Sequence, residues 1–214
     1  MFSKGEKEMR EIVIPGEKLS DKNIKTGYGA YAKKGKVYSS IHGIAVKTRD
    51  FVKEVPLHGK YLPHEGDQVI GIVEAVRFKG CFVELNSPYN GYLPLEREDE
   101  CKVGDLIMTR ITEVTNVNEV TLNDPRKLYD GKLIELQPVK VPRVIGKSGS
   151  MLRILRAATQ TMIFVGRNGR IFIKGEKEQV TKVEKALNMI EREAHTFGLT
   201  SRVKQFLENK EEIK

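Results

Sequence analysis

Apolar residues recur at every second position along the first part of the chain, which is the spacing of half-buried β-strands. We expect short strands at residues 11–14, 26–31, 37–41 and 44–47. The lysine-rich residues 33–36 stand between two of these strands and predict a hairpin turn. Such a small sheet cannot bury a large core, so we expect it to pack on something else.

From residue 66 the alternation becomes regular and glycines separate the apolar runs. The runs cover residues 67–76, 80–85, 91–95, 105–114 and 117–122. Five short strands with turn residues between them predict a small closed barrel of the OB type.

After residue 130 the period changes from strand to mixed. Residues 132–141 read as a strand, residues 150–159 as a helix, and residues 161–165 and 170–174 as two strands joined by an Asn-Gly turn. A long amphipathic helix follows, with one apolar face made of Val180, Val183, Leu187, Ile190 and Ala194. The remainder from residue 201 is charged, and we expect it to fray as a tail.

Charge adds a partner class to this picture. The 214 residues carry 37 Lys and Arg against 29 Asp and Glu, a net charge of +8. The excess lies in residues 1–60 (+6) and 131–214 (+8), whereas residues 61–130 carry −6. A cationic balance favours a polyanionic partner, either nucleic acid or a membrane surface, and the two basic ends are the first candidates for phosphate contact.

Several classes are disfavoured by what the sequence contains. There is no apolar run of the ~20 residues that span a bilayer and no apolar segment of signal-peptide type at the start, so we expect a soluble cytoplasmic protein that does not bind membranes. Cys81 and Cys101 are too few for a disulfide framework, which fits a reducing compartment.

No pattern indicates catalysis, a metal or a cofactor. The four histidines are far apart in sequence, and no nucleophile motif or phosphate-binding P-loop is present. An acidic cluster (Glu96, Glu98, Asp99, Glu100) has no His partner and is interpreted as a solvated face rather than a metal site. We therefore expect a protein that is not an enzyme, with no cofactor.

The strongest candidate site is a Gly-x-x-Gly sequence within residues 144–152. Two glycines let the backbone approach phosphates, and the N–H groups at the start of the next helix carry partial positive charge. The segment resembles the signature loop of KH domains, which clamps about four nucleotides of single-stranded RNA. The order strand, short helix, Gly-x-x-Gly, helix, strand, strand, helix supports this, and the alternative is a plain helix–turn–helix connection. The candidate RNA-binding residues here are Arg143, Gly146, Lys147, Ser148, Gly149 and Arg153.

A second Gly-x-x-Gly occurs at residues 166–169. It joins two strands rather than two helices, so turn chemistry explains its glycines and no clamp role is assigned to it.

Residues 66–122 resemble the ribosomal-protein S-one type of OB fold, through Gly66-Asp67 and the Gly80 and Gly91 strands. Lys79 stands where that type usually has an aromatic residue, and Pro94 where it usually has histidine. An ordinary base-stacking platform is therefore not predicted. The barrel candidates are Arg77, Lys79 and Arg110 as phosphate contacts and Phe82 and Tyr92 as base-stacking residues. The alternatives are solvated surface charge for the cations and a core position for Phe82.

The whole order of segments resembles the RNA-binding cap subunits of the archaeal exosome, of the ribosomal RNA-processing protein four type. The residues that carry the resemblance include 14–17, 27–29, 61–71 and 166–171, and it covers residues 10–200. It implies a multidomain fold, β plus α+β. The parts are an N-terminal β domain for ring docking (1–60), a five-stranded OB-fold barrel (61–128), a type I βααββα KH domain (129–200) and a charged C-terminal tail (201–214).

The resemblance also implies a function. Three cap subunits of that family sit on a hexameric RNase PH-like ring and feed it single-stranded RNA for 3′-to-5′ degradation. We accordingly expect single-stranded RNA, such a ring and other cap subunits in a trimeric cap as partners. The alternatives are a translation or ribosome-associated RNA-binding factor, a ribonuclease that acts alone, and a β-rich scaffold whose charge is incidental.

Overall fold

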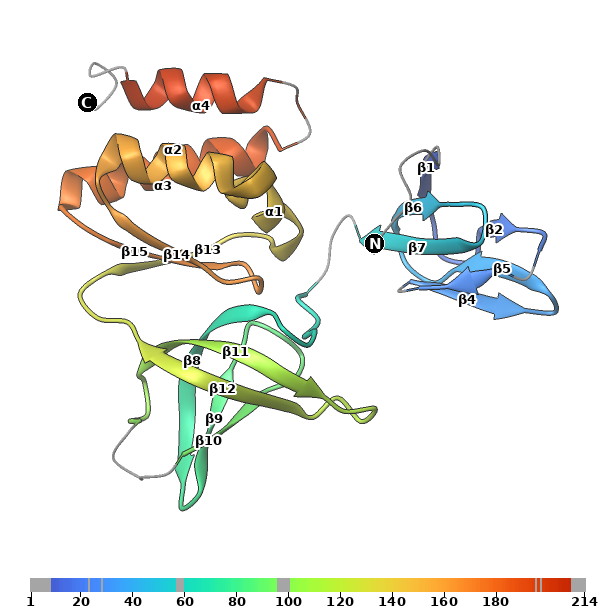
Figure 1. The fold of residues 1–214 in the computed structure, drawn as a ribbon, viewed down its shortest axis with the longest axis horizontal. Helices are drawn as coiled ribbons and strands as arrows, with labels where there is room; N and C mark the ends of the chain where they lie inside the picture. The colour runs from blue at the N-terminus through green and yellow to red at the C-terminus, as the bar shows by residue number, and fades with distance from the viewer. Residues whose placement is uncertain are drawn as a thin grey trace. The chain divides into compact units, whose positions relative to one another are not determined.

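The computed structural model describes residues 9–22, 24–27, 29–56, 60–95, 101–194, 196 and 198–208. The chain forms two compact units, Met1–Gly59 and Lys60–Lys214 (Figure 1). The first unit consists of β-strands, and the second contains a β-barrel followed by a region of strands and helices. The multidomain β plus α+β fold class expected from the sequence is confirmed.

The N-terminal unit consists of two small sheets around a shared core. Its strands are β1 (Met9–Val13), β2 (Lys18–Ser20), β3 (Lys25–Thr26), β4 (Ala30–Lys33), β5 (Lys36–Ser39), β6 (Gly43–Lys47) and β7 (Phe51–Pro56). One sheet has the order β1-β6-β7-β3 and the other β2-β5-β4. The predicted lysine-rich hairpin joins β4 to β5, and Lys34 and Gly35 both have positive φ, as a type I′ turn requires. The core consists of Val13, Leu19, Val37, Ala45 and Val52.

The five strands expected after residue 66 close into a barrel. They are β8 (Gln68–Arg77), β9 (Gly80–Glu84), β10 (Gly91–Pro94), β11 (Leu106–Val114) and β12 (Val120–Lys127), in the order β10-β12-β11-β8-β9. The last strand begins at Val120 instead of residue 117, because Asn118 adopts a left-handed backbone in the preceding turn. Strand β12 then continues five residues beyond the expected end at residue 122 and leads directly towards the next region.

The region after the barrel is a three-stranded sheet with helices. It contains β13 (Lys132–Glu135), η2 (Pro138–Lys140), α1 (Val141–Ile145), η3 (Lys147–Gly149), α2 (Ser150–Thr159), β14 (Met162–Val165), β15 (Arg170–Lys174) and α3 (Lys177–Arg192). The sheet order is β13-β15-β14. The strand expected to reach residue 141 ends at Glu135, since Pro138 and Pro142 cannot donate to a ladder and instead open short helices.

The expected charged tail is wrong up to Glu208. Helix α4 (Leu199–Glu208) buries Leu199, Val203 and Leu207, which join the core formed by α2 and α3. Their spacing of four residues places the three side chains on one helix face, a pattern that the high charge of this segment obscured. Within the described residues, no helix has the length and apolar character needed to cross a membrane.

The barrel and the C-terminal sheet share an apolar contact. Ile70, Leu128 and Phe172 are buried together there, with partly buried Leu106, Met108, Leu133 and Phe164 against them. These residues belong to the barrel, to the link after β12 and to the outer face of the sheet. The two parts therefore pack as one unit.

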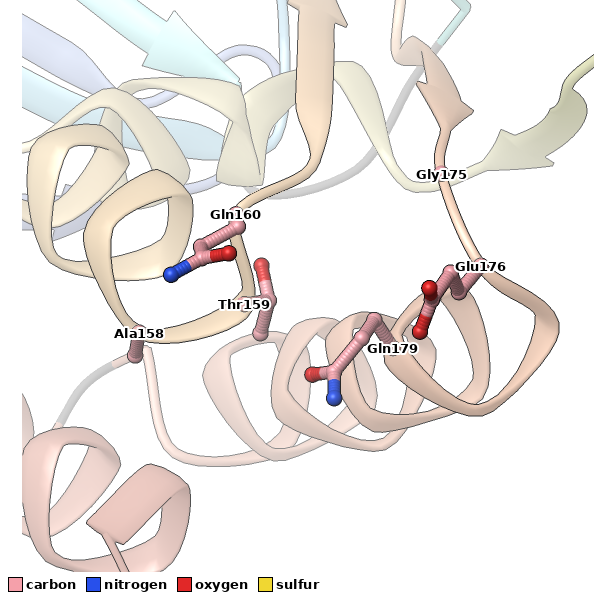
Figure 2. A pocket seen from close by; sticks show the side chains of 6 residues that line it. All are labelled: Ala158, Thr159, Gln160, Gly175, Glu176 and Gln179. Atoms are coloured by element: carbon pink, nitrogen blue, oxygen red, sulfur yellow. The ribbon is translucent and has the colours of Figure 1, made fainter.

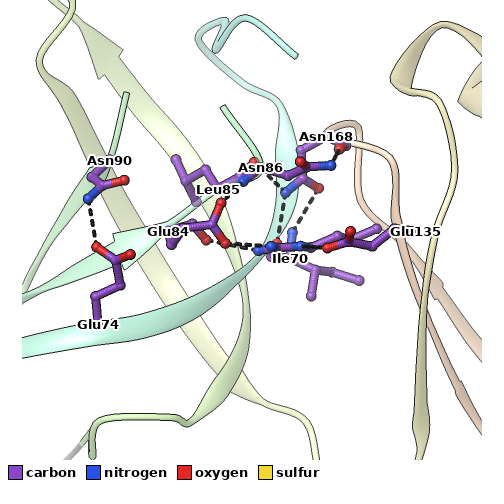
Figure 3. Close-up of polar contacts among 9 residues, drawn as sticks. Ile70, Glu74, Glu84, Leu85, Asn86, Asn90, Glu135 and Asn168 are labelled. Carbon is purple, nitrogen blue, oxygen red and sulfur yellow. Dashed lines mark hydrogen bonds and ion pairs between the residues drawn. The ribbon is translucent and has the colours of Figure 1, made fainter. Parts of the chain in front are cut away.

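Polar contacts of the β14–β15 loop complete this junction (Figure 3). The ladder between β8 and β9 begins at the pair Ile72 and Glu84, so the preceding part of β8 extends beyond it. The Asn168 amide enters there: its Nδ2 donates to Ile70 O and Leu85 O at 2.8 Å each, and its Oδ1 accepts from Ile70 N at 3.2 Å. The side chain is fully buried and acts in place of a neighbouring strand.

An arginine reinforces the same junction. The Arg170 side chain is almost completely buried and donates to Glu135 at 2.8 Å, to Glu84 O at 3.0 Å and to the Glu84 carboxylate. It is thus neutralised by one carboxylate from the barrel and one from β13, as a buried guanidinium requires.

Candidate nucleic-acid interface

The predicted clamp loop lies between α1 and α2 and has an unusual backbone. Gly146 (φ 74°), Ser148 (φ 51°) and Gly149 (φ 76°) all have positive φ, so the chain reverses sharply before α2 begins at Ser150. Inside the loop, Gly149 N donates to Gly146 O at 3.2 Å. Neither α1 nor α2 has an acidic residue in its first turn. The positive end of α2 is therefore not neutralised locally and favours an anion.

The space around the α-carbon differs between the two glycines of the loop. A Cβ on Gly146 would lie 2.7 Å from Met151 N, so a side chain there collides with the start of α2. A Cβ on Gly149 would meet nothing within 4 Å. Gly146 is thus needed for packing, whereas Gly149 leaves open space beside a half-buried backbone. That open side is where a ligand backbone can approach.

Three exposed cations lie in or next to this loop. Arg143, Lys147 and Arg153 are exposed, as is Ser148. A cleft of about 320 Å³ contains Arg143, Gly146 and Lys147 on one wall and residues at the start of α4 on the other, among them Gly198 and Thr200. Arg153 is not among the residues that line this cleft, and its Nη2 reaches Ser148 O at 3.5 Å. The six residues predicted for the clamp are therefore gathered at one place, and α4 is an additional wall that the sequence did not indicate.

Four of the five barrel candidates also lie together. Arg77 and Lys79 flank the β8–β9 turn and are exposed. Phe82 is 41% exposed and faces Tyr92 across β9 and β10, with ring centroids 5.6 Å apart, while Tyr92 Oη donates to Lys79 O at 2.9 Å. The alternative of a core position for Phe82 is thus wrong, because its neighbours on β9 point inward and it points outward.

Two further observations refine the barrel surface. Phe78, in the same turn, is 80% exposed. It adds a third aromatic side chain to this surface, one position before Lys79. Arg110 is exposed but pairs with Gln68, whereas Phe82 pairs with Ala75. Seven residues along β8 separate those pairs, roughly 23 Å at the rise of a strand. Arg110 therefore does not belong to the surface formed by the other four.

The second Gly-x-x-Gly is structural, and for a reason beyond turn chemistry. A Cβ on Gly166 would lie 2.8 Å from Ile70 N of the barrel, so the loop needs glycine to approach β8. Its Asn168 is occupied with backbone groups of the barrel, as described above. The side-chain amide of Asn168 is therefore not available to bind RNA.

Another cavity of the described residues differs in chemistry from the clamp cleft (Figure 2). It measures about 410 Å³ at the far end of α2, and its lining includes Thr159, Gln160, Gln179 and Glu176 but no Lys or Arg. Without a cation it does not suit a phosphate.

Side chains that could ligate a metal are dispersed in the described part of the chain. Among them, no group of three or more His, Cys, Asp or Glu side chains converges on one point. The acidic cluster interpreted as a solvated face (Glu96, Glu98, Asp99, Glu100), together with His58 and His195, lies outside the described part of the chain.

Comparisons with known proteins follow the same division of the chain. Residues 10–58 match the family model of the exosome RNA binding protein RRP4 N-terminal domain, and residues 132–192 match the KH domain. The chain is 41% identical over 211 residues to the exosome complex component Rrp4 of Methanothermus fervidus, covering 92% of this chain and 95% of that protein. The chain belongs to the Rrp4 family.

Other Rrp4 relatives agree. The exosome complex component Rrp4 of Methanosarcina mazei is 42% identical over 214 residues, which is 94% of this chain and 82% of that protein. A crystal structure described as that of an exosome complex RNA-binding protein aligns with a TM-score of 0.64 at 33% identity, covering 70% of this chain and 96% of its own. The resemblance to exosome cap subunits inferred from the sequence is thus confirmed at the level of the Rrp4 family.

Proposed function

We propose that this protein is a non-catalytic RNA-binding cap subunit of an archaeal exosome in the cytoplasm. It captures single-stranded RNA and feeds it to a hexameric RNase PH-like ring for 3′-to-5′ degradation. The observation that carries the RNA-binding part is the α1–α2 loop, whose open Gly149 lies among exposed cations at the positive end of α2. Membership of the Rrp4 family supports the exosome part. Family membership does not favour the alternative of a translation or ribosome-associated factor.

The barrel supplies a second element of the RNA path. Phe78, Phe82 and Tyr92 are aromatic side chains at least partly open to solvent, and Arg77 and Lys79 lie beside them. Stacking and phosphate contact of this kind tolerate any base. We therefore expect modest sequence preference and a steep loss of affinity with salt.

The N-terminal unit is proposed to dock on the ring within a trimeric cap. Strand β1 is at the edge of its sheet, and Ile12 and Ile14, on and just after it, are 66% and 60% exposed. Apolar side chains at a sheet edge are suited to contact with another protein. In this division the ring contact lies in residues 1–60, the barrel in 61–128 and the KH domain in 129–200.

The clamp is tested by Gly149→Asp. A carboxylate about 4 Å from a bound phosphate costs roughly 1–4 kcal/mol between the dielectric constants of water and of a protein surface. We expect at least a fivefold loss of affinity for labelled single-stranded RNA. The matched control is Gly35→Asp, which also has positive φ (73°), no atom within 4 Å of the added Cβ and the same charge change. Equal affinities of the two variants would remove the clamp from the proposal.

The other parts of the proposal have their own measurements. The purified chain with magnesium and phosphate is expected to leave RNA at full length, and shortening of the RNA would contradict a non-catalytic role. The double variant Ile12→Asp, Ile14→Asp is expected to lose co-elution with the RNase PH-like ring while it retains RNA binding. Co-sedimentation with ribosomes instead of the ring would favour the translation alternative.

A further inference from the structure

A groove at the junction of the barrel and the KH domain is not explained by the clamp or by the barrel surface. It measures about 170 Å³ and is lined by Arg126, Lys127, Leu128, Tyr129, Met162, Phe164, Phe172 and Lys174. We call this set the junction groove. It lies on the sheet, where Phe164 and Phe172 belong to the apolar contact with the barrel. The clamp loop and α2 belong to the helical part of the domain.

The junction groove combines exposed apolar side chains with cations. Tyr129 is 58% exposed and Met162 is 54% exposed, although both adjoin a buried apolar cluster. The guanidinium of Arg126 lies over the Phe164 ring, with Cζ 5.1 Å from its centroid. A flat cation held on an aromatic face is itself a stacking surface for a further ring.

The charges of the groove leave one cation available. Lys127 pairs with Asp105 at 2.8 Å, and Lys174 pairs with Asp130 at 3.4 Å. Arg126 is exposed and forms no ion pair with any carboxylate of the described residues. A ligand that brings both an apolar ring and a negative charge would bury the rings and neutralise Arg126 at the same time.

Size restricts that ligand. The cavity of about 170 Å³ is smaller than the ~300–1,000 Å³ typical of pockets for whole cofactors. It suits a single ring system, with the rest of the molecule outside.

The position of the groove relates it to the clamp. Helix α2 starts at the clamp loop and has ten residues, a length of about 15 Å at 1.5 Å per residue. Strand β14 begins with Met162 just after α2 ends, and it is an edge strand of its sheet. Ile163 packs with the helices and Phe164 faces the barrel, so Met162, two residues before Phe164, lies on the barrel face of the sheet. A polymer held at the clamp and running along α2 therefore reaches the groove by passing around the edge strand β14.

We propose that the junction groove binds one nucleobase of a single-stranded RNA, stacked on Tyr129 and the Arg126 guanidinium, with the adjoining phosphate near Arg126. This inference rests on the proposed function, since it extends the path of the same RNA. In this arrangement the KH domain binds RNA at two points, the clamp loop at the start of α2 and the groove beyond its end.

The test compares two RNA lengths, one of about four nucleotides, which a KH clamp can hold alone, and one about three times longer. We expect Tyr129→Ala to lower affinity for the longer RNA by roughly 5- to 100-fold, the range of one base stack on an aromatic ring. It should leave binding of the short RNA unchanged. Tyr129→Phe should retain wild-type affinity, since the ring remains. The matched control is Tyr31→Ala, another exposed tyrosine, in the N-terminal unit.

A salt series separates stacking from charge. Arg126→Gln should reduce the slope of log affinity against log salt for the longer RNA by about 0.7, the value for one phosphate of a single strand. Tyr129→Ala should lower affinity at every salt concentration without changing that slope. Far-UV circular dichroism of each variant verifies the fold.

The outcomes distinguish this inference from the proposed function. If Gly149→Asp weakens binding while Tyr129→Ala binds both RNAs like wild type, the groove is not an RNA site and the clamp stands. If Tyr129→Ala weakens both RNAs equally, its effect is not local to a second site and the inference is wrong. A groove that serves a protein partner would also leave both affinities unchanged. If the wild-type chain binds neither RNA, both proposals fall.

Discussion

Removal of the Asn168 amide should loosen the joint between barrel and KH domain. In Asn168→Ala, three backbone hydrogen bonds are lost, at the N–H and C=O of Ile70 and at the C=O of Leu85, and the Ile70 C=O keeps only the long contact from Arg170 Nη1 at 3.5 Å. All three lie at a buried junction, where Ile70, Leu85 and Asn168 have no exposed side-chain surface. A neighbouring strand cannot take over, because the β8–β9 ladder begins only at Ile72.

The magnitude follows from the three hydrogen bonds. A net contribution of about 1 kcal/mol for each gives a loss of about 3 kcal/mol in the free energy of unfolding of the second unit. Partial entry of water into the space left by the amide would reduce this value, and a fully dry junction would increase it. Three kcal/mol corresponds to about a 100-fold increase in the population of the open form.

Native-state hydrogen exchange measures this population separately in each unit. Amides of β8 and β15 should lose about 100-fold in protection, while those of the N-terminal unit should not change. The matched control is Asn90→Ala, whose amide bonds Glu74 at 2.8 Å on the exposed barrel surface, and Figure 3 shows both asparagines. That substitution should change protection by less than about threefold. Equal protection in the two variants would refute the strand-replacing role of Asn168.

Three other predictions concern the cores and buried titratable groups. Burial raises the pKa of Glu54 above its ordinary 4.5, so folding favours the protonated acid. The contribution of Glu54 to the stability of the N-terminal unit should be complete below pH 4.5 and be lost as the pH rises through the raised pKa. Glu54→Gln should flatten this dependence in thermal melts, and an unchanged slope would contradict the assignment. Burial also raises the pKa of Cys81 to about 12, so a thiol reagent at pH 8 should label it only on unfolding, whereas rapid labelling of the native chain would show that the site is open. Val203→Ala on α4 should cost about 1–3 kcal/mol in urea unfolding, against almost nothing for the exposed Lys204→Ala, and equal midpoints would mean that α4 does not stabilise the domain.

The pattern of apolar and turn residues predicted those elements whose ends are set by neighbouring residues in the chain. The range of α2 and the range of β15 agree with their predicted bounds, since α2 has regular apolar spacing and β15 is a short apolar run that directly follows the Asn-Gly turn. The lysine-rich hairpin was also predictable, because Lys34-Gly35 suits a turn with two positive φ values. The first strand of the KH domain was predicted too long, because Pro138 interrupts a run that still alternates in hydrophobicity.

Features that depend on distant contacts were not predictable. Residue spacing placed Gly166 and Asn168 in a turn, but the partner that explains them is β8, about a hundred residues earlier in the chain. Likewise α4 gave only a weak signal within a charged segment, although it forms a wall of the clamp cleft. For the candidate site, sequence identified the loop and its cations. The separation of Arg110 from the other barrel candidates required the register of β8.

The way β8 is completed sets a limit on how this chain can be divided. A fragment that ends with the barrel at residue 128 would lack the loop that satisfies Ile70 and Leu85, so it would present an unpaired strand edge to water. The same fragment would expose Ile70, Leu106 and Met108, which the KH sheet covers in the intact chain. An open edge beside an apolar patch is a template for self-association. The smallest soluble piece that contains the barrel is therefore expected to run from residue 60 to 208, and an isolated barrel should aggregate as it is purified.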